Sequence, residues 1–155
     1  MMPDFLGWIA DTVRSAWLTA RNRPRVTCDN LTAYQPRWCP DWFLDDSGNE
    51  IASGIQIEVY VNFLLANEGP VDTSIKDIYI DIEHNRNKHD QLRCPLPVQK
   101  VEIAPRRTWG PKSIEFTGSI WDVDEPSHDW KAEFVVEPLA QRPIRRKIKL
   151  YFNSI

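Results

Sequence analysis

Histidine, cysteine and carboxylate side chains occur close together in one segment, and these are the side chains that bind zinc. His84 and His89 bracket a basic, polar stretch, Asp90 and Cys94 follow, and His128 lies elsewhere in the chain. Structural zinc sites favour tighter pairs, with a second pair to complete four ligands. The spacing therefore predicts a plain surface loop without a metal. Nothing in the sequence places Cys94 beside a histidine, so a cysteine nucleophile has no support either.

A second group of such residues is the acidic segment 121–130, which carries four carboxylates. Oxygen-rich loops at one end of a β-sandwich are how C2-type modules bind Ca²⁺, but about six to eight oxygen ligands are needed. A second loop would have to supply the remaining oxygen ligands, and Asp45 and Asp46 are the obvious candidates. They begin the segment 45–50, which lacks the register of an EF-hand and is predicted as a hairpin turn. We expect solvated loop charges and no metal, and the alternative is a peripheral, Ca²⁺-dependent C2-like membrane module.

Cations gather in residues 142–149, where five Lys and Arg side chains occur without an acidic one. A stripe of this kind could meet an acidic partner, a phosphate or an anionic membrane. Alternation explains it more simply, because Lys147 and Lys149 fall on the wet side of an expected strand, and lysine on an edge strand discourages aggregation. A solvated edge strand is the favoured interpretation. Arg145 and Arg146 are kept as candidates for an interaction surface.

Tryptophan and proline are concentrated in residues 34–44, which include Trp38 and Trp42. Rigid aromatic side chains on a loop are typical of binding surfaces. A proline-braced loop whose tryptophans cover one end of the domain has the same composition, and it is favoured because large apolar side chains are usually buried. Trp38 and Trp42 remain candidate contact residues under the first interpretation.

Residues 4–21 show the period of an amphipathic helix, with Trp8 and Trp17 flanking its apolar face. Asp4 can cap its start, and Pro24 ends the segment. The charges of the helix are nearly balanced, whereas an interfacial membrane helix would carry Lys and Arg along its polar face. The sequence therefore predicts that the helix packs on the rest of the domain. Contact with a partner chain or a second copy, and contact with a membrane, are the less favoured alternatives.

After the helix the period of the apolar residues changes to two, which indicates β-strands. In residues 55–65 every odd position is apolar, and most even positions before 64 are polar. Ile75 has the wrong parity for the alternating set 78–83, so either a bulge between Ile75 and Ile78 or a strand that starts later is expected. Gly54 and Gly118 are expected to mark further bulges. Other strands are predicted at 78–83, 98–104, 114–121, 132–136 and 144–152, with a weaker candidate at 26–33.

Six or seven short strands separated by turns predict a mainly β fold, an antiparallel β-sandwich of about seven strands with one N-terminal amphipathic helix. The pattern resembles immunoglobulin-like and fibronectin-type domains over residues 25–155, although it lacks the Cys…Trp…Cys signature of a true immunoglobulin domain. Residues 1–24 are expected to hold the helix and a linker. A chain of 155 residues with 42% hydrophobic residues fits one such domain.

Composition narrows the function further. A formal net charge of -3 disfavours a dedicated nucleic-acid binder, which relies on excess Lys and Arg. Three cysteines without C-x-x-C spacing suit free thiols in a reducing compartment, and neither a signal peptide nor an apolar run of about 20 residues is visible, so a cytoplasmic location is predicted. We expect no cofactor. The sequence predicts a non-enzymatic binding or structural module that acts through protein–protein contacts, including contact with a second copy.

Overall fold

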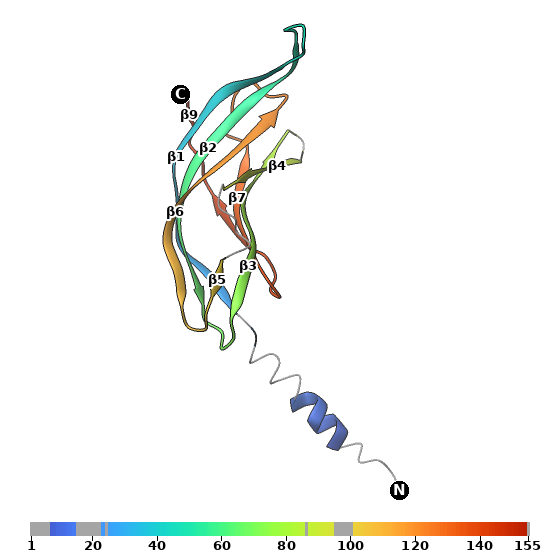
Figure 1. Cartoon of the computed structure of the whole chain (residues 1–155), viewed down its shortest axis with the longest axis vertical. Helices are drawn as coiled ribbons and strands as arrows, with labels where there is room; N and C mark the ends of the chain where they lie inside the picture. Colours follow the sequence, from blue (N-terminus) through green and yellow to red (C-terminus); the bar gives the residue numbers. More distant parts are fainter. Residues whose placement is uncertain (1–6, 15–22, 24, 86, 95–100, 155) are drawn as a thin grey trace.

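A computed structural model of the chain describes residues 7–14, 23, 25–85, 87–94 and 101–154. The fold is mainly β, with nine strands in the described residues and a helix at residues 7–14 (Figure 1). The strands are β1 (Val26–Leu44), β2 (Glu50–Asn67), β3 (Thr73–His84), β4 (Lys88–Arg93), β5 (Glu102–Ile103), β6 (Thr108–Trp121), β7 (Lys131–Pro138), β8 (Ile144–Ile148) and β9 (Asn153–Ser154).

The strands form one curled sheet in the order β8-β7-β3-β4-β6-β2-β1-β9, and β5 pairs with the start of β3. All pairings are antiparallel except the short one between β1 and β9. A single residue pair, Arg93 with Thr117, joins β4 to β6. The predicted mainly β, antiparallel fold with one short helix is confirmed, and the sheet has the shape of a half-barrel (Figure 1).

The sheet has two arms, β8-β7-β3-β4 and β6-β2-β1-β9. The core lies on the concave side of the sheet, where alternating side chains from the two arms meet. Every odd residue of β2 from Ile55 to Leu65 is fully buried. Across the core, Phe134 of β7 lies 4.9 Å from Phe63 of β2 and 5.9 Å from Phe116 of β6, measured between ring centroids. Strands that are not neighbours in the sheet therefore pack against each other through their side chains.

Two segments predicted as loops are strands. Residues 34–44 belong to the 19-residue strand β1, and residues 88–93 form β4. Prolines are tolerated in β1 because this strand pairs continuously with β2 only, and β9 borders it at two residues. Register irregularities at Asn30 and Gln35, whose φ angles are 54° and 50°, bend the strand without ending it.

The expected bulge after Ile75 is confirmed by a register shift between Ile75 and Asp77. The bulges expected at Gly54 and Gly118 are wrong, because the pairing of β2 with β6 is regular at both glycines. Both positions are instead points of close approach. A Cβ atom at Gly54 would lie 2.3 Å from the carbonyl oxygen of Ile120, and one at Gly118 would lie 2.8 Å from Cδ2 of Leu92 in β4.

In the helix at residues 7–14, the exposed fractions of Trp8, Ile9 and Val13 are 65%, 37% and 62%. The predicted packing of this face on the sheet is therefore wrong for the described part of the helix. Trp17 lies outside the described residues. No helix in the described ranges has the length and apolar content needed to cross a membrane. The division into residues 1–24 and 25–155 stays a prediction.

Candidate functional site

The β1–β2 hairpin ends in a tight turn that is organised by one side chain. Asp45 Oδ1 accepts hydrogen bonds from the backbone N–H groups of Ser47 at 2.9 Å and Asn49 at 2.8 Å. The N–H of Gly48 donates to the Asp45 carbonyl at 3.0 Å, and its φ of 82° suits glycine. The predicted hairpin turn at 45–50 is confirmed. These bonds give the tip a defined shape.

Three consecutive large apolar residues lead into this turn and remain exposed. Trp42, Phe43 and Leu44 expose 61%, 61% and 58% of their surfaces. The pairing of β2 with β6 ends at Gly54, so the β1–β2 hairpin extends beyond the end of β6. The projecting hairpin is visible at the top of Figure 1. The tip of the hairpin therefore presents apolar side chains to the surroundings.

The loop between β6 and β7 runs beside the hairpin. The N–H of Asp122 donates to the Ser53 carbonyl at 2.9 Å, and the rings of Phe43 and Trp121 meet edge to face at 6.1 Å. The close approach of β6 at Gly54 makes this contact possible. We call the hairpin residues 41–50 and the loop residues 121–130 together the apex.

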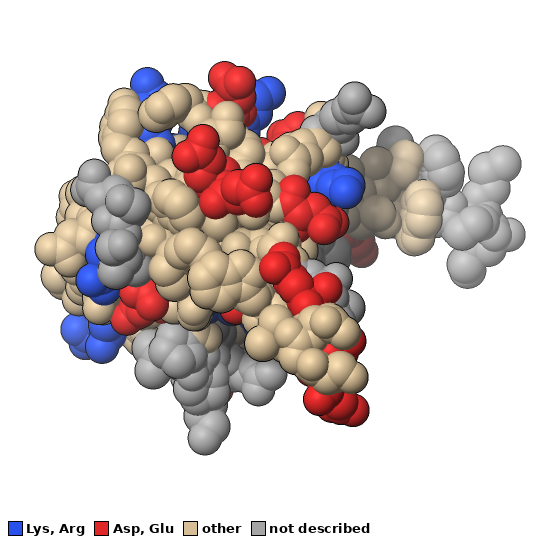
Figure 2. Space-filling model, turned by 90° about the horizontal axis from the view of Figure 1, so that it is seen from above, with Lys and Arg blue, Asp and Glu red and all other residues tan. Residues whose placement is uncertain are grey.

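The apex is strongly acidic. Its two segments contain eight Asp and Glu residues and no Lys or Arg. Figure 2, viewed from above this end, shows carboxylates outnumbering cations on the visible face. Apolar side chains surrounded by carboxylates suit a ligand that carries both apolar and cationic groups, since burial of the first and charge attraction of the second add.

The apex does not assemble a metal site from its described side chains. Within the described ranges, no group of three or more His, Cys, Asp and Glu side chains lies close enough to hold a metal ion. Asp45, which the Ca²⁺ alternative would need as a ligand, uses one carboxylate oxygen to hold the turn. The geometry gives the Ca²⁺ alternative no support.

His84 and His89 belong to the β3–β4 hairpin, where the sequence predicted a surface loop, whereas His128 lies in the apex loop. His84 is buried, and its Nε2 lies 2.6 Å from Asp90 Oδ2. His89 Nδ1 lies 2.9 Å from Asp81 Oδ2. The His84 ring also contacts Trp130 at 5.5 Å, which connects the acidic loop to this hairpin. Sequence reasoning missed these pairs because the partners come together only through the hairpin register.

The other sequence candidates are distributed over different parts of the fold. Trp38 is half-buried and packs against the core, which agrees with a covering role, whereas Trp42 is exposed. Arg145 and Arg146 are exposed on β8, where neighbouring residues point to opposite faces of the sheet. They therefore do not form one continuous surface.

Arg146 also lies close enough to the thiol of Cys28 to affect it. Burial raises the pKa of this thiol to about 11, and the positive charge of Arg146 offsets part of the increase. A thiol in this state is a poor nucleophile at neutral pH. Cys28, Cys39 and Cys94 all lie in the described residues, and none of them forms a disulfide.

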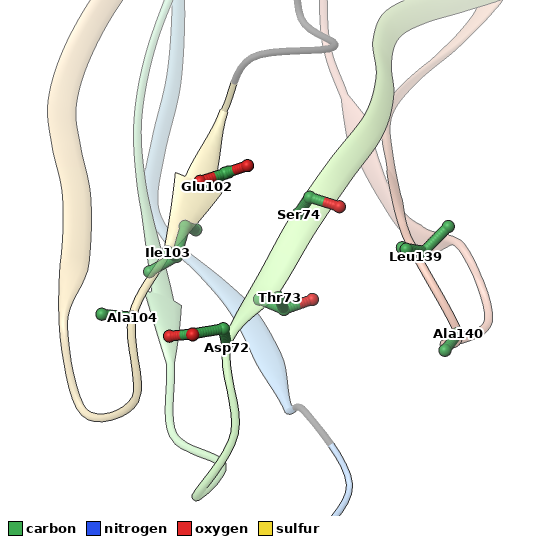
Figure 3. Close-up of a pocket in the computed structure, with 8 residues that line it drawn as sticks. All are labelled: Asp72, Thr73, Ser74, Glu102, Ile103, Ala104, Leu139 and Ala140. Atoms are coloured by element: carbon green, nitrogen blue, oxygen red, sulfur yellow. The ribbon is translucent and has the colours of Figure 1, made fainter.

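At the opposite end, which we call the base, an open pocket of about 520 Å³ lies between the start of β3 and the segment after β7. In Figure 3 the hydroxyl groups of Thr73 and Ser74 point toward the side of Leu139, whereas Asp72 points away. Thr73 Oγ1 is buried and has no hydrogen-bond partner among the described residues. Carboxylates, hydroxyl groups and apolar side chains line the pocket, and its lining contains no histidine, cysteine or lysine.

A second hollow at the base, of about 850 Å³, is lined by Arg23, Lys76, Arg142 and the residues from Pro138 to Gln141. The Gln141 side chain, which lines this hollow, is held by two hydrogen bonds. Its Oε1 accepts from the Val26 N–H at 2.8 Å, and its Nε2 donates to the Val26 carbonyl at 3.1 Å. The segment after β7 is thereby attached to the first residue of β1.

No protein-family model matches the sequence, and a search of curated proteins finds no match either. Among solved structures, the chain is similar to a crystal structure described as the "Putative ApaA Protein from Bordetella pertussis". The sequence identity is 16%, the alignment covers 84% of this chain and 93% of that chain, and the TM-score is 0.35.

Proposed function

We propose that the protein is a non-enzymatic binding module that contacts a partner protein through the apex. The observation that supports this most directly is the exposed run of Trp42, Phe43 and Leu44 on a rigid hairpin tip. Trp42 and Phe43 are neighbours in β1 and point to opposite faces of the hairpin, so the tip exposes a large aromatic side chain on each face. Exposed aromatic side chains on a defined turn are typical of binding surfaces.

The chemistry of the partner follows from the charges around the tip. Eight carboxylates without a cation favour a partner segment that carries Lys or Arg beside apolar side chains. The same carboxylates would be repelled by an anionic lipid surface, so the peripheral membrane alternative has less support. We further propose a cytoplasmic location, because an odd set of three cysteines without C-x-x-C spacing suits free thiols in a reducing compartment.

For the fold, we propose that the curled sheet is a form of the immunoglobulin-like sandwich. The two arms, β8-β7-β3-β4 and β6-β2-β1-β9, share a single residue pair between β4 and β6. Their side chains meet across the core, as Phe63 and Phe134 do. An experimental structure in which β4 and β6 pair along their length would contradict this proposal.

Affinity capture from the native cell lysate tests the binding role. The full chain is compared with a Trp42→Ala, Phe43→Ala double variant and with Tyr151→Ala. Tyr151 is 72% exposed and lies outside the apex, so it controls for the loss of an exposed aromatic side chain.

We expect the wild type and Tyr151→Ala to retain the same proteins, and the double variant to lose them. Retention should also fall at high salt, because exposed charge pairs are screened. Equal retention by the double variant, or no protein retained by the wild type above bare resin, would contradict the proposal.

A further inference from the structure

The hollow at the base has a charge opposite to that of the apex. Among the described residues that line it, Arg23, Lys76 and Arg142 are cationic and none is acidic. The nearest carboxylates in sequence are engaged elsewhere. Asp77 pairs with Arg93 at 2.8 Å, and Glu137 accepts a hydrogen bond from the Tyr79 hydroxyl at 3.1 Å. The lining of the hollow is therefore net positive, and the carboxylates of Asp72 and Glu102 belong to the adjoining pocket, which shares Leu139 and Ala140 with it.

The hollow also has an apolar component and a fixed shape. Leu139 is 57% exposed at its rim. The N–H of Leu139 donates to the Ser74 carbonyl at 2.9 Å, and Gln141 makes its two hydrogen bonds to Val26. Since both ends of this short segment are attached to the sheet, its shape is set before a partner arrives, which reduces the entropy lost on binding.

The apex and the hollow are complementary in three respects. The apex projects and the hollow is concave, the apex is acidic and the hollow is basic, and each offers exposed apolar side chains. A hollow of about 850 Å³ lies in the size range of sites that bury a large side chain or ligand.

The two surfaces of one molecule cannot meet each other. β1 starts at Val26, which contacts Gln141 in the hollow, and ends at Leu44 in the apex. Nineteen residues of strand, at about 3.3 Å per residue, give a path of roughly 60 Å along β1 between the two ends. The apex of one molecule can therefore reach only the hollow of another.

From these observations we propose that the protein associates with itself head to tail, with the apex of one copy seated in the basic hollow of the next. This inference rests on the proposed binding role of the apex and names a second copy of the chain as its partner. The contact is heterologous, so every open assembly keeps one unused apex at one end and one unused hollow at the other, unless a ring closes. Association therefore continues beyond a dimer as the protein concentration rises.

Sedimentation velocity of the full chain tests this directly. The wild type should form species larger than the 18.1 kDa monomer at low salt, in increasing amounts at higher concentration, and should return toward the monomer at high salt. An apex variant carries Trp42→Ala and Asp46→Lys. A hollow variant carries Leu139→Ser and Arg142→Glu. Lys149→Glu, an exposed charge change outside both surfaces, is the control.

For each surface variant alone, the dissociation constant of self-association should be more than about tenfold that of the wild type. The control should have the dissociation constant of the wild type. An equal mixture of the two variants is the decisive sample. The apex variant supplies only an intact hollow and the hollow variant only an intact apex, so the mixture should form a dimer of twice the 18.1 kDa chain mass and nothing larger. Circular dichroism of each variant shows whether it remains folded.

A wild type that stays monomeric at low salt over the whole concentration range would overturn the inference, and so would a mixture that behaves as the sum of its two components. Failure here is distinct from failure of the proposed function. If apex substitutions abolish capture from a lysate while the wild type sediments as a monomer, the apex binds a different protein. If they leave capture unchanged, the binding role of the apex fails as well.

Discussion

Replacing Gln141 with alanine should loosen the base of the fold. The Gln141 side chain makes two hydrogen bonds with the backbone of Val26, which lies 115 residues away in sequence. It joins the segment between β7 and β8, at one end of the strand order, to β1 near the other end. Val26 is 3% exposed, so its backbone groups have little access to water as a substitute partner.

The size of the effect follows from these two bonds. A typical intramolecular hydrogen bond contributes about 0.5–1.5 kcal/mol net, and leaving a buried polar group without a partner costs about 1–3 kcal/mol. We therefore expect Gln141→Ala to lower the free energy of unfolding by about 2–3 kcal/mol. For a domain of this size, a loss of 1 kcal/mol lowers Tm by about 2–4 °C, so Tm should fall by about 4–12 °C.

Urea unfolding followed by tryptophan fluorescence, together with thermal unfolding followed by circular dichroism, measures this loss. Gln141→Glu keeps the acceptor for the Val26 N–H but removes the donor, so it should lose stability as well. Gln91→Ala is the matched control, because Gln91 is exposed and its side chain accepts a hydrogen bond only from Arg93, which is exposed as well and keeps its pairing with Asp77. A Gln141→Ala variant that unfolds within about 0.5 kcal/mol of the wild type, with an unchanged m-value, would refute the reasoning.

Three other substitutions test separate features. Gly118→Ala should destabilise the fold by about 1–3 kcal/mol, because the new Cβ would lie 2.8 Å from the Leu92 side chain of β4. Urea unfolding measures this loss. A neutral result would mean that β4 does not pass close to Gly118. Trp38→Ala should lower the free energy of unfolding by about 2–4 kcal/mol, since the Trp38 side chain packs on the core. Trp42→Ala, at an exposed position, should change it by less than about 0.5 kcal/mol. Similar losses for both variants would contradict the assigned burial. Cys28 should react with a thiol reagent at pH 8 much more slowly than the partly exposed Cys39, because a pKa of about 11 leaves about one thousandth of the thiol ionised. Its pKa is raised on folding from 9.0 to about 11, so stability should fall as pH rises from about 9 through about 11, and Cys28→Ala should remove that part of the pH dependence.

Strand alternation was readable from the sequence wherever one face of a strand is covered by the core. Residues 55–65 alternate strictly, and their odd members are all fully buried in β2. β4 was missed because five of its six residues are polar, and Leu92 alone is fully buried. Its position depends on pairing with β3 and on the space above Gly118, which are tertiary contacts without a local sequence signal.

Trp38 and Trp42 separate what the sequence determined from what the tertiary structure decided. The sequence alone determined a mainly β chain, its principal strands and an aromatic segment ahead of the turn at 45–50. The two tryptophans lie four residues apart on the same face of β1, opposite Ile57 and Ser53 of β2. Trp38 packs against the core and Trp42 is exposed, because the pairing of β2 with β6 ends at Gly54 and the hairpin continues alone beyond it. The burial of a side chain on β1 depends on whether another part of the sheet covers it, and the point at which β6 ends decides this for Trp42.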